Sequence, residues 1–186
     1  MTRLANDHLV LRPVLPDDAL AFCNAVTESI PEISPWMDWC SPGYTLEIAQ
    51  AWANSRPNAW SSRTAYAFAI LDAQDGVLLG GCNLSHLNPD YRLANLSYWV
   101  RTSRTGQGIA SAAAVMVARF GFEYLGLVRV EIVAAVENMA SLRAAEKAGA
   151  VREGVLRNRI TVRDRIYDAV MFSLIPEDLG VRRELG

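Results

Sequence analysis

A glycine-containing turn joins a strand-like segment to a helix-like segment near the middle of the 186-residue chain. The turn runs from Arg104 to Ala110, and one residue separates Gly106 from Gly108. Glycines carry no Cβ, so backbone N–H groups can approach a ligand, and the first turn of a helix leaves N–H donors unpaired at the positive end of the helix dipole. The run predicts a cradle for an anion such as a pyrophosphate, although a tight turn without a ligand is the simpler interpretation.

Two segments flank this turn and set the local chain order. Residues 94–100 alternate between apolar and polar side chains, a pattern typical of a strand. From Ile109 onward apolar residues recur at helical spacing, which predicts a helix that Gly121 or Gly126 can end. The apolar run 128–135 predicts another strand. Strand, helix and strand in this order predict a right-handed parallel crossover.

The remaining segments predict an α/β (α+β) fold, with a mixed, mostly antiparallel sheet of about seven strands and about four flanking helices. The chain length predicts a single domain over residues 1–186, with a core of about 8–175 and a short C-terminal tail. Alternation and capping residues predict further strands at 8–12, 64–71, 77–86, 151–160 and 165–174, and further helices at 16–29, 45–57 and 138–149.

Composition excludes several classes of protein. Apolar residues make up 51% of the chain, which provides a core and excludes a disordered or fibrous protein. A net charge of −2 argues against nucleic acid as a partner. Three cysteines and two histidines at no metal-binding spacing predict no metal and a reducing, cytoplasmic location. No apolar run approaches the roughly 18 residues of a membrane span, so we expect a soluble protein without a membrane partner. We expect it to be a monomer or a homodimer.

The glycine turn lacks the signatures of two common phosphate-binding loops, because no Lys-Ser or Lys-Thr pair follows Gly108 and no third glycine stands at the dinucleotide spacing. It resembles the pyrophosphate-binding signature of the GNAT superfamily of acyl-CoA-dependent N-acetyltransferases, usually written Q/R-x-x-G-x-G/A. Gly108 and Ala110 match, and Gly106 is glycine as in many members, whereas the first position is Thr105, with Arg104 one residue earlier. The stretches 98–103 and 138–141 resemble the branch that contains the ribosomal-protein N-terminal serine and alanine acetyltransferases. The resemblance covers nearly the whole chain.

This resemblance implies that the strands at 94–100 and 128–135 splay apart, with acetyl-CoA, the acetyl donor, between them. A neutral amine would attack the thioester directly, so the site needs a donor for the oxyanion, an acid for the leaving thiolate and an acceptor for the amine proton. Ser141 matches the proposed general acid of the family, and Tyr98 is the alternative. The resemblance assigns acetyl-CoA binding to Val100, Thr102, Gly106, Gln107, Gly108, Ile109, Ala110 and Asn138.

Asn138 and Ser141 also have a purely structural interpretation. Asparagine at the start of a helix, followed by serine three residues later, is ordinary capping chemistry. Arg101, Arg104 and Arg143 could reach the ribose phosphate of the donor, or could be exposed arginines without a specific role.

The base that accepts the amine proton is not specified by the pattern. Relatives often have a carboxylate where this chain has Asn95, and the ribosomal-protein serine acetyltransferase has a glutamate where this chain has Ile160. Asp38, Glu153 and Asp90 are the remaining candidates. Asp38 lies among aromatic residues in a proline-rich loop, which could line an amine pocket or form a lid packed on the core.

The function that these patterns predict is acetyl-CoA-dependent N-acetylation of an amine. We expect a peptide or protein N-terminal α-amine as the acceptor, because an enzyme without a strong base must rely on amine that is already neutral, and a weakly basic α-amine has a larger neutral fraction at pH 7 than a lysine side chain. A small-molecule amine acetyltransferase, a CoA-binding sensor without turnover and a structural interaction domain are the alternatives.

Overall fold

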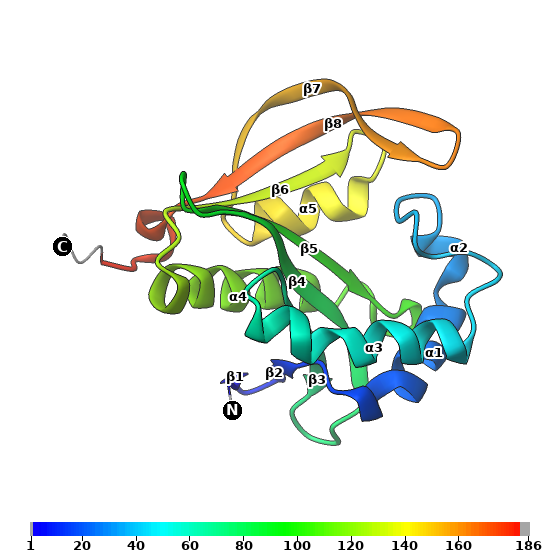
Figure 1. Cartoon of the computed structure of the whole chain (residues 1–186). Helices are drawn as coiled ribbons and strands as arrows, with labels where there is room; N and C mark the ends of the chain where they lie inside the picture. The colour runs from blue at the N-terminus through cyan, green and yellow to red at the C-terminus, as the bar shows by residue number, and fades with distance from the viewer. Residues whose placement is uncertain (1, 183–186) are drawn as a thin grey trace.

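The computed structural model describes residues 2–182 (Figure 1). Short 3-10 turns occupy Pro16–Asp18, Thr102–Arg104 and Pro176–Leu179. The helices are α1 (Ala19–Glu28), α2 (Ile30–Ile33), α3 (Leu46–Ser61), α4 (Ile109–Leu125) and α5 (Met139–Lys147). The strands are β1 (Leu4–Ala5), β2 (Leu9–Pro13), β3 (Tyr66–Asp72), β4 (Leu78–Asn88), β5 (Leu93–Val100), β6 (Arg129–Ala135), β7 (Val151–Val162) and β8 (Arg165–Leu174).

The strands form an eight-stranded sheet in the order β1-β2-β3-β4-β5-β6-β8-β7. Neighbouring strands are antiparallel except β5 and β6, which are parallel and connected through α4. The predicted mixed, mostly antiparallel sheet with a central crossover is therefore confirmed. The strand β1 lies outside the predicted elements, because a segment of two residues is too short to show alternation.

The parallel pair β5 and β6 is hydrogen-bonded at one end only. The ladder covers residues 93–95 of β5 and 129–131 of β6. Beyond it the strands diverge toward their C-terminal ends, where α4 and α5 begin (Figure 1). The expected splayed pair is therefore present. From Leu96 to Val100 one edge of β5 has no strand partner within residues 2–182, so its backbone groups can be satisfied by a ligand or by water.

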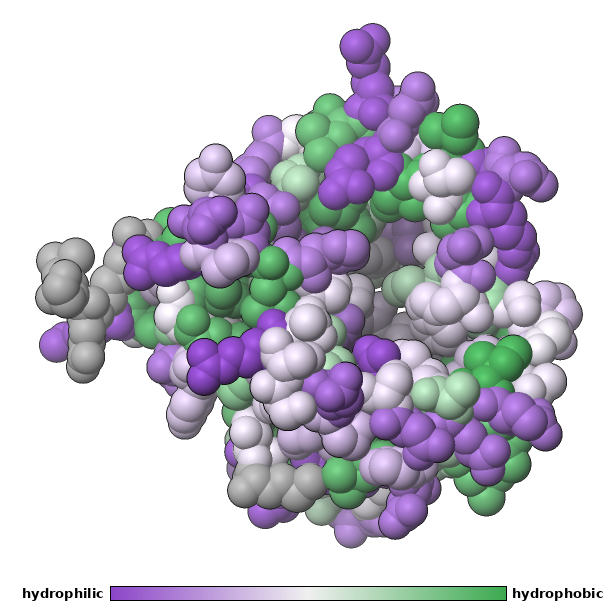
Figure 2. Space-filling view, viewed as in Figure 1, coloured by the Kyte–Doolittle hydropathy of each residue, from purple (hydrophilic) through white to green (hydrophobic). Residues whose placement is uncertain are grey.

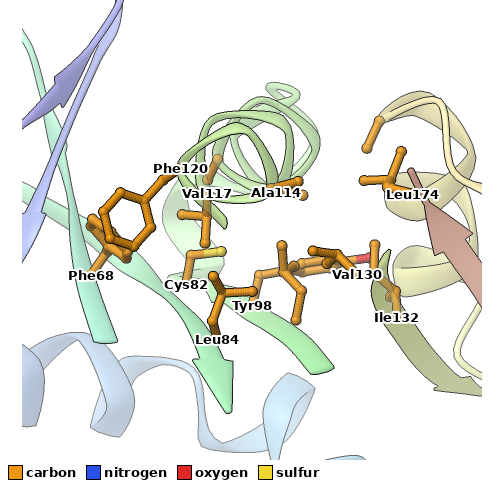
Figure 3. Close-up of a cluster of buried hydrophobic side chains, with 14 of the residues drawn as sticks. Phe68, Cys82, Leu84, Tyr98, Ala114, Val117, Phe120, Val130, Ile132 and Leu174 are labelled. Atoms are coloured by element: carbon orange, nitrogen blue, oxygen red, sulfur yellow. The ribbon is translucent and has the colours of Figure 1, made fainter. Parts of the chain in front are cut away.

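Alternation along β3 determines which helices cover each face of the sheet, because adjacent strand residues point to opposite sides. Phe68 shares a core with Val117 and Phe120 of α4, and Figure 3 shows the side chains of this helix projecting toward the sheet. The neighbouring Ala67 and Ala69 pack with α1 and α3 on the other face. Small residues there let these two helices lie close to the sheet.

The helix α3 extends past its predicted end at Pro57. Proline lacks the N–H that an interior helical position donates, yet the helix contains Pro57 and continues to Ser61. Trp60 holds the last turn in place. Its ring lies 4.9 Å, centroid to centroid, from that of Tyr66, and its Nε1 donates a hydrogen bond to the carbonyl of Ala67 at 3.2 Å. Tertiary packing thus overrides the local preference.

A short helix, α2, replaces part of the loop predicted around Pro31, Pro35 and Pro42. Pro31 stands in the first turn of α2, where its missing N–H leaves no helical hydrogen bond unmade. The predicted count of about four helices therefore becomes five α-helices in residues 2–182.

Gly80 lets β4 approach β5 closely. A Cβ on Gly80 would lie 2.1 Å from the carbonyl oxygen of Trp99, a distance that no side chain could occupy. The β3–β4 register also shifts here, between Ile70 and Leu71. Gly80 and the neighbouring Gly81 thus lie at a bulge and a close backbone approach, two settings in which glycine is common inside strands.

Candidate active site

A cleft of about 460 Å³ lies where β5 and β6 separate. Figure 2 shows the surface hollowed between the half that carries β6 to β8 and the half that carries α1 to α3. The cleft is walled by α2, the end of β5, the glycine turn, the start of α4 and α5. The predicted site residues that line it are Val100, Gly106, Gly108, Ile109, Ala110, Asn138 and Ser141. Thr102 and the exposed Gln107 are not among its lining residues.

The glycine turn presents a row of unpaired backbone donors to this cleft. Gly106 and Gly108 both have φ of +77°, a left-handed conformation that favours glycine. Gly108 is the N-cap residue of α4, and no side chain caps this end of the helix. Within residues 2–182, the backbone N–H groups from Gly106 to Ser111 donate to no acceptor. A Cβ on Gly106 would meet no protein atom within 4 Å, so the space beside it is open. These features suit an anionic group such as a pyrophosphate.

Basic side chains stand around the same turn. Arg143 and Lys147 lie one helical turn apart on α5, and both line the cleft together with Arg104. Lys147 reaches close to the glycine turn, because a Cβ on Gly108 would lie 3.3 Å from its Nζ. Arg104 is also 3.6 Å from the carboxylate of Asp72. The turn therefore combines polar N–H groups with positive charge.

The end of α1 anchors the segment that leads into the turn. Glu28 accepts hydrogen bonds from Nε of Arg101 at 3.1 Å and from the N–H of Ser103 at 2.9 Å. The Arg101 hydrogen bond, followed by that of Ser103, lowers the pKa of Glu28 to about 2. The Oγ of Ser29 accepts the N–H of Thr102 at 2.9 Å. Arg101 and Thr102 are therefore engaged within the protein and hold the loop in position.

Two hydroxyl groups lie together in the cleft. The hydroxyl of Tyr98 donates to the carbonyl of Ser141 at 3.0 Å, and Oγ of Ser141 lies 3.4 Å from the Tyr98 oxygen. Burial raises the pKa of Tyr98 to about 12, so this hydroxyl stays protonated at neutral pH. Oδ1 of Asn138 accepts the backbone N–H of Ser141 at 3.1 Å, which confirms the predicted helix cap. The cap uses the backbone of Ser141 and leaves its hydroxyl for other contacts.

The three candidate bases lie outside the cleft lining. The exposed Asp38 accepts the N–H of Arg163 at 3.1 Å. Glu153 binds the guanidinium of Arg129 at 2.7 and 2.6 Å, which lowers the pKa of this carboxyl to about 2. Asp90 lies in the exposed turn before β5, at the opposite end of that strand from the cleft. None of the three carboxylates therefore faces the cleft in this structure.

Asn95 and Ile160, the positions where relatives can carry carboxylates, also lie outside the cleft lining. The carboxylate that does line it is Glu32 of α2, whose Oε2 accepts the hydroxyl of Thr102 at 2.9 Å.

The sequence profile of the acetyltransferase (GNAT) domain matches residues 8–151. The chain belongs to the GNAT acetyltransferase family. A protein of Bacillus subtilis (strain 168) named "Putative ribosomal N-acetyltransferase YdaF" is 26% identical over 178 residues, which cover 93% of this chain and 94% of that protein.

Solved structures of this family share the fold. A Vibrio cholerae protein named as a "putative ribosomal-protein-serine acetyltransferase" has a TM-score of 0.82 and 27% identity, and the match covers 94% of this chain and 98% of that one. RimJ of Mycobacterium smegmatis, solved with a CoA disulfide, has a TM-score of 0.82 and 24% identity, with coverage of 96% and 88%. At 24% identity, the similarity to RimJ shows a shared fold and nothing about the reaction.

The acetyltransferase contains a second cavity of about 320 Å³ between the sheet and the helices α1 and α3. It shares Met37, Tyr98 and Trp99 with the cleft, so the two cavities meet at these side chains. Aromatic rings dominate its walls: Phe22, Trp39, Tyr44, Trp52, Phe68, Tyr98 and Trp99. Trp39 and Tyr44 belong to the loop between α2 and α3, which we call the aromatic loop. This loop both packs on the core and lines a pocket.

Sequence reasoning missed several residues at the two cavities. Lys147 could have been found, because it follows Arg143 by four residues on a predicted helix and shares its face. Glu32 lies in the unpredicted α2, and Trp99 lies on the less apolar side of its strand. Trp52 comes from α3, whose weak amphipathic pattern does not single it out.

Two negative findings apply to residues 2–182 alone. No helix there is long and apolar enough to cross a membrane. No group of three or more histidine, cysteine, aspartate or glutamate side chains could hold a metal ion in this part of the chain.

Proposed function

We propose that the protein transfers the acetyl group of acetyl-CoA to a weakly basic amine, foremost the α-amino group of a peptide or protein N-terminus. The observation that carries this proposal is the row of unpaired N–H groups from Gly106 to Ser111, at the open end of the splayed strands. Backbone donors in a ligand-sized cleft need acceptors, and a pyrophosphate offers several charged oxygens.

The residues present fit acetyl-CoA. Its diphosphate would rest on the glycine turn, and Arg143 and Lys147 would neutralise phosphate charge beside it. The unpaired edge of β5 between Leu96 and Val100 offers backbone groups to the amides of the pantetheine arm. The thioester would then lie near Tyr98 and Ser141, where the cleft meets the second cavity.

The hydroxyls of Ser141 and Tyr98 are the groups that can assist departure of the thiolate. Burial raises the pKa of Tyr98 to about 12, so its hydroxyl is protonated at neutral pH, and it already donates to the carbonyl of Ser141. Ser141 is the proposed acid, because its hydroxyl is not used by the helix cap. A fixed hydroxyl aimed at developing negative charge is worth more in a water-poor cleft than in bulk water.

The acceptor preference follows from the hydrogen bonds of these hydroxyls, because within residues 2–182 neither Tyr98 nor Ser141 is hydrogen-bonded to a carboxylate that could serve as a base. An α-amino group with a pKa of about 8 is roughly one-tenth neutral at pH 7, whereas a lysine side chain near 10.4 is neutral in about one part in 2,500. The difference corresponds to about 3.3 kcal/mol of additional barrier for lysine. Glu32, a carboxylate of the cleft lining, is oriented on the α2 wall by the hydroxyl of Thr102, which its Oε2 accepts.

Thiol release from acetyl-CoA tests this function. One reaction contains a peptide with a free N-terminus and no lysine, and the matched reaction contains an N-terminally blocked peptide with one lysine. We expect faster release with the first peptide and a mass increase of one acetyl group on its N-terminus. Calorimetry with acetyl-CoA separates the alternatives: binding without turnover across both peptides and small amines would identify a sensor, and no binding would refute the proposed site.

A further inference from the structure

The second cavity has walls made of a connected series of aromatic rings. Ring centroids lie 5.0 Å apart for Trp52 and Phe22 and 6.0 Å apart for Phe22 and Trp99. The series continues from Trp99 to Trp39 and from Trp39 to Tyr44, again at 6.0 Å in each case. These rings come from α1, α3, β5 and the loop after α2. Such a wall offers a large apolar area at low conformational cost.

The cavity adjoins the proposed reaction centre. Tyr98, whose hydroxyl contacts Ser141, lines both the cleft and the second cavity. An amine that approaches a thioester beside Ser141 from the side opposite the glycine turn therefore has the second cavity around its substituent. That substituent must fit the chemistry of the aromatic walls.

The walls favour a neutral apolar group over a cation. The lining residues include no aspartate, glutamate, lysine or arginine, and burial raises the pKa of Tyr44 to about 12, so its hydroxyl is neutral. Aromatic rings can bind cations, but the guanidinium of Arg56 already lies 5.2 Å from the ring centroid of Trp52. A second positive charge near this ring would be repelled.

We propose that the second cavity is the acceptor site and that it selects an amine with a large apolar or aromatic substituent. This inference rests on the proposed function. A peptide that begins with phenylalanine, tryptophan or leucine meets this description. A residue as small as serine or alanine would leave much of a cavity of about 320 Å³ unfilled. The acceptor would thus differ from that in the name of the Vibrio cholerae structure, which refers to serine.

A series of amino-acid amides tests this selectivity, because their α-amino groups have similar basicity. We expect kcat/KM for phenylalaninamide and leucinamide to exceed that for glycinamide and serinamide by roughly ten- to hundredfold, as burial of one large apolar side chain allows. Trp39→Ala and Trp52→Ala should remove most of this advantage by raising KM for phenylalaninamide. The control Tyr91→Ala removes an aromatic ring that is 72% exposed in the turn before β5, and it should change nothing.

A binding measurement separates this inference from the proposed function. Calorimetry with N-acetylphenylalaninamide, the expected product, needs neither acetyl-CoA nor turnover, and we expect binding that Trp39→Ala weakens at least fivefold. If no amine is acetylated but this ligand binds as described, the proposed reaction fails and the apolar cavity assignment stands. Equal kcat/KM across the amides, or a preference for lysinamide or spermidine, would overturn the apolar selectivity while leaving the acetyltransferase function intact.

Discussion

Replacing Gly106 with alanine separates a binding role of the glycine turn from a folding role. The backbone of Gly106 has φ of +77°, and a Cβ there would meet no protein atom within 4 Å. Gly126, at the opposite end of α4, has φ of +67° and equally open surroundings. The helix of 17 residues holds the two ends about 25 Å apart. Gly126→Ala is therefore a matched control with the same backbone strain and no contact with the cleft.

The two substitutions should have the same effect on stability. A left-handed alanine costs roughly 1–2 kcal/mol, and the lower entropy of the unfolded chain offsets about 0.4–1 kcal/mol of that cost. The net loss of about 1 kcal/mol corresponds to a Tm decrease of about 2–4 °C for a chain of this size. Neither variant should lose its fold.

Only Gly106→Ala should weaken acetyl-CoA binding. Its methyl group enters the space that the phosphate oxygens need, and one lost charge-assisted hydrogen bond is worth about 1.5–3 kcal/mol. That loss raises Kd by roughly 10- to 150-fold. Thermal unfolding and calorimetry on both variants supply the comparison. Equal acetyl-CoA Kd values for Gly106→Ala and Gly126→Ala would show that the turn is structural and would refute the cradle.

Three further substitutions probe the residues around the cleft. Ser141→Ala should change the free energy of unfolding by less than about 1 kcal/mol, because the cap binds its backbone, and should reduce kcat far more than acetyl-CoA affinity; an unchanged kcat would rule out the acid role. Glu28 has a folded-state pKa of about 2 against an ordinary 4.5, so its stabilising pairing with Arg101 is complete above about pH 5 and disappears toward pH 2. The Tm difference between wild type and Glu28→Gln should therefore shrink as the pH falls through this window, and a constant difference would contradict the pairing. Arg163→Ala removes the guanidinium that donates to the carbonyl of Cys40 at 2.8 Å and should raise KM for the amine while acetyl-CoA Kd stays constant; a change in the acetyl-CoA Kd alone would show that the loop serves the donor side.

Much of the fold could be predicted because its signals are local. The alternation of Phe68 with alanines correctly predicts a strand, and the structure adds that the alanine face is the one on which α1 and α3 pack. The cap at Asn138 follows from residue type and position alone. The splay of β5 and β6 is different. The point at which the hydrogen bonds between two strands end depends on both strands together. Only the family resemblance predicted that β5 and β6 separate.

The contacts that position the loop between α2 and α3 are long-range, and local patterns do not encode them. Asp38 and Arg163 are separated by 125 positions in the chain, yet they are hydrogen-bonded. Trp36 of the aromatic loop packs on Tyr167 of β8 with ring centroids 5.9 Å apart. Pattern reasoning could name Asp38 as a candidate base, but it could not show that a backbone N–H already occupies its carboxylate.

The same loop explains how a sheet with an open centre can hold a defined site. Beyond Asn95 the two halves of the sheet have no direct hydrogen-bonded ladder between β5 and β6. The segment after α1 bridges them: Ser29 binds the loop that follows β5, whereas Asp38 binds the turn between β7 and β8. Met37, between these anchors, lines both cavities. Substrate selection is therefore expected to depend on this segment, whose geometry is set by side-chain contacts to both halves, whereas the proposed donor cradle lies in the glycine turn that follows β5.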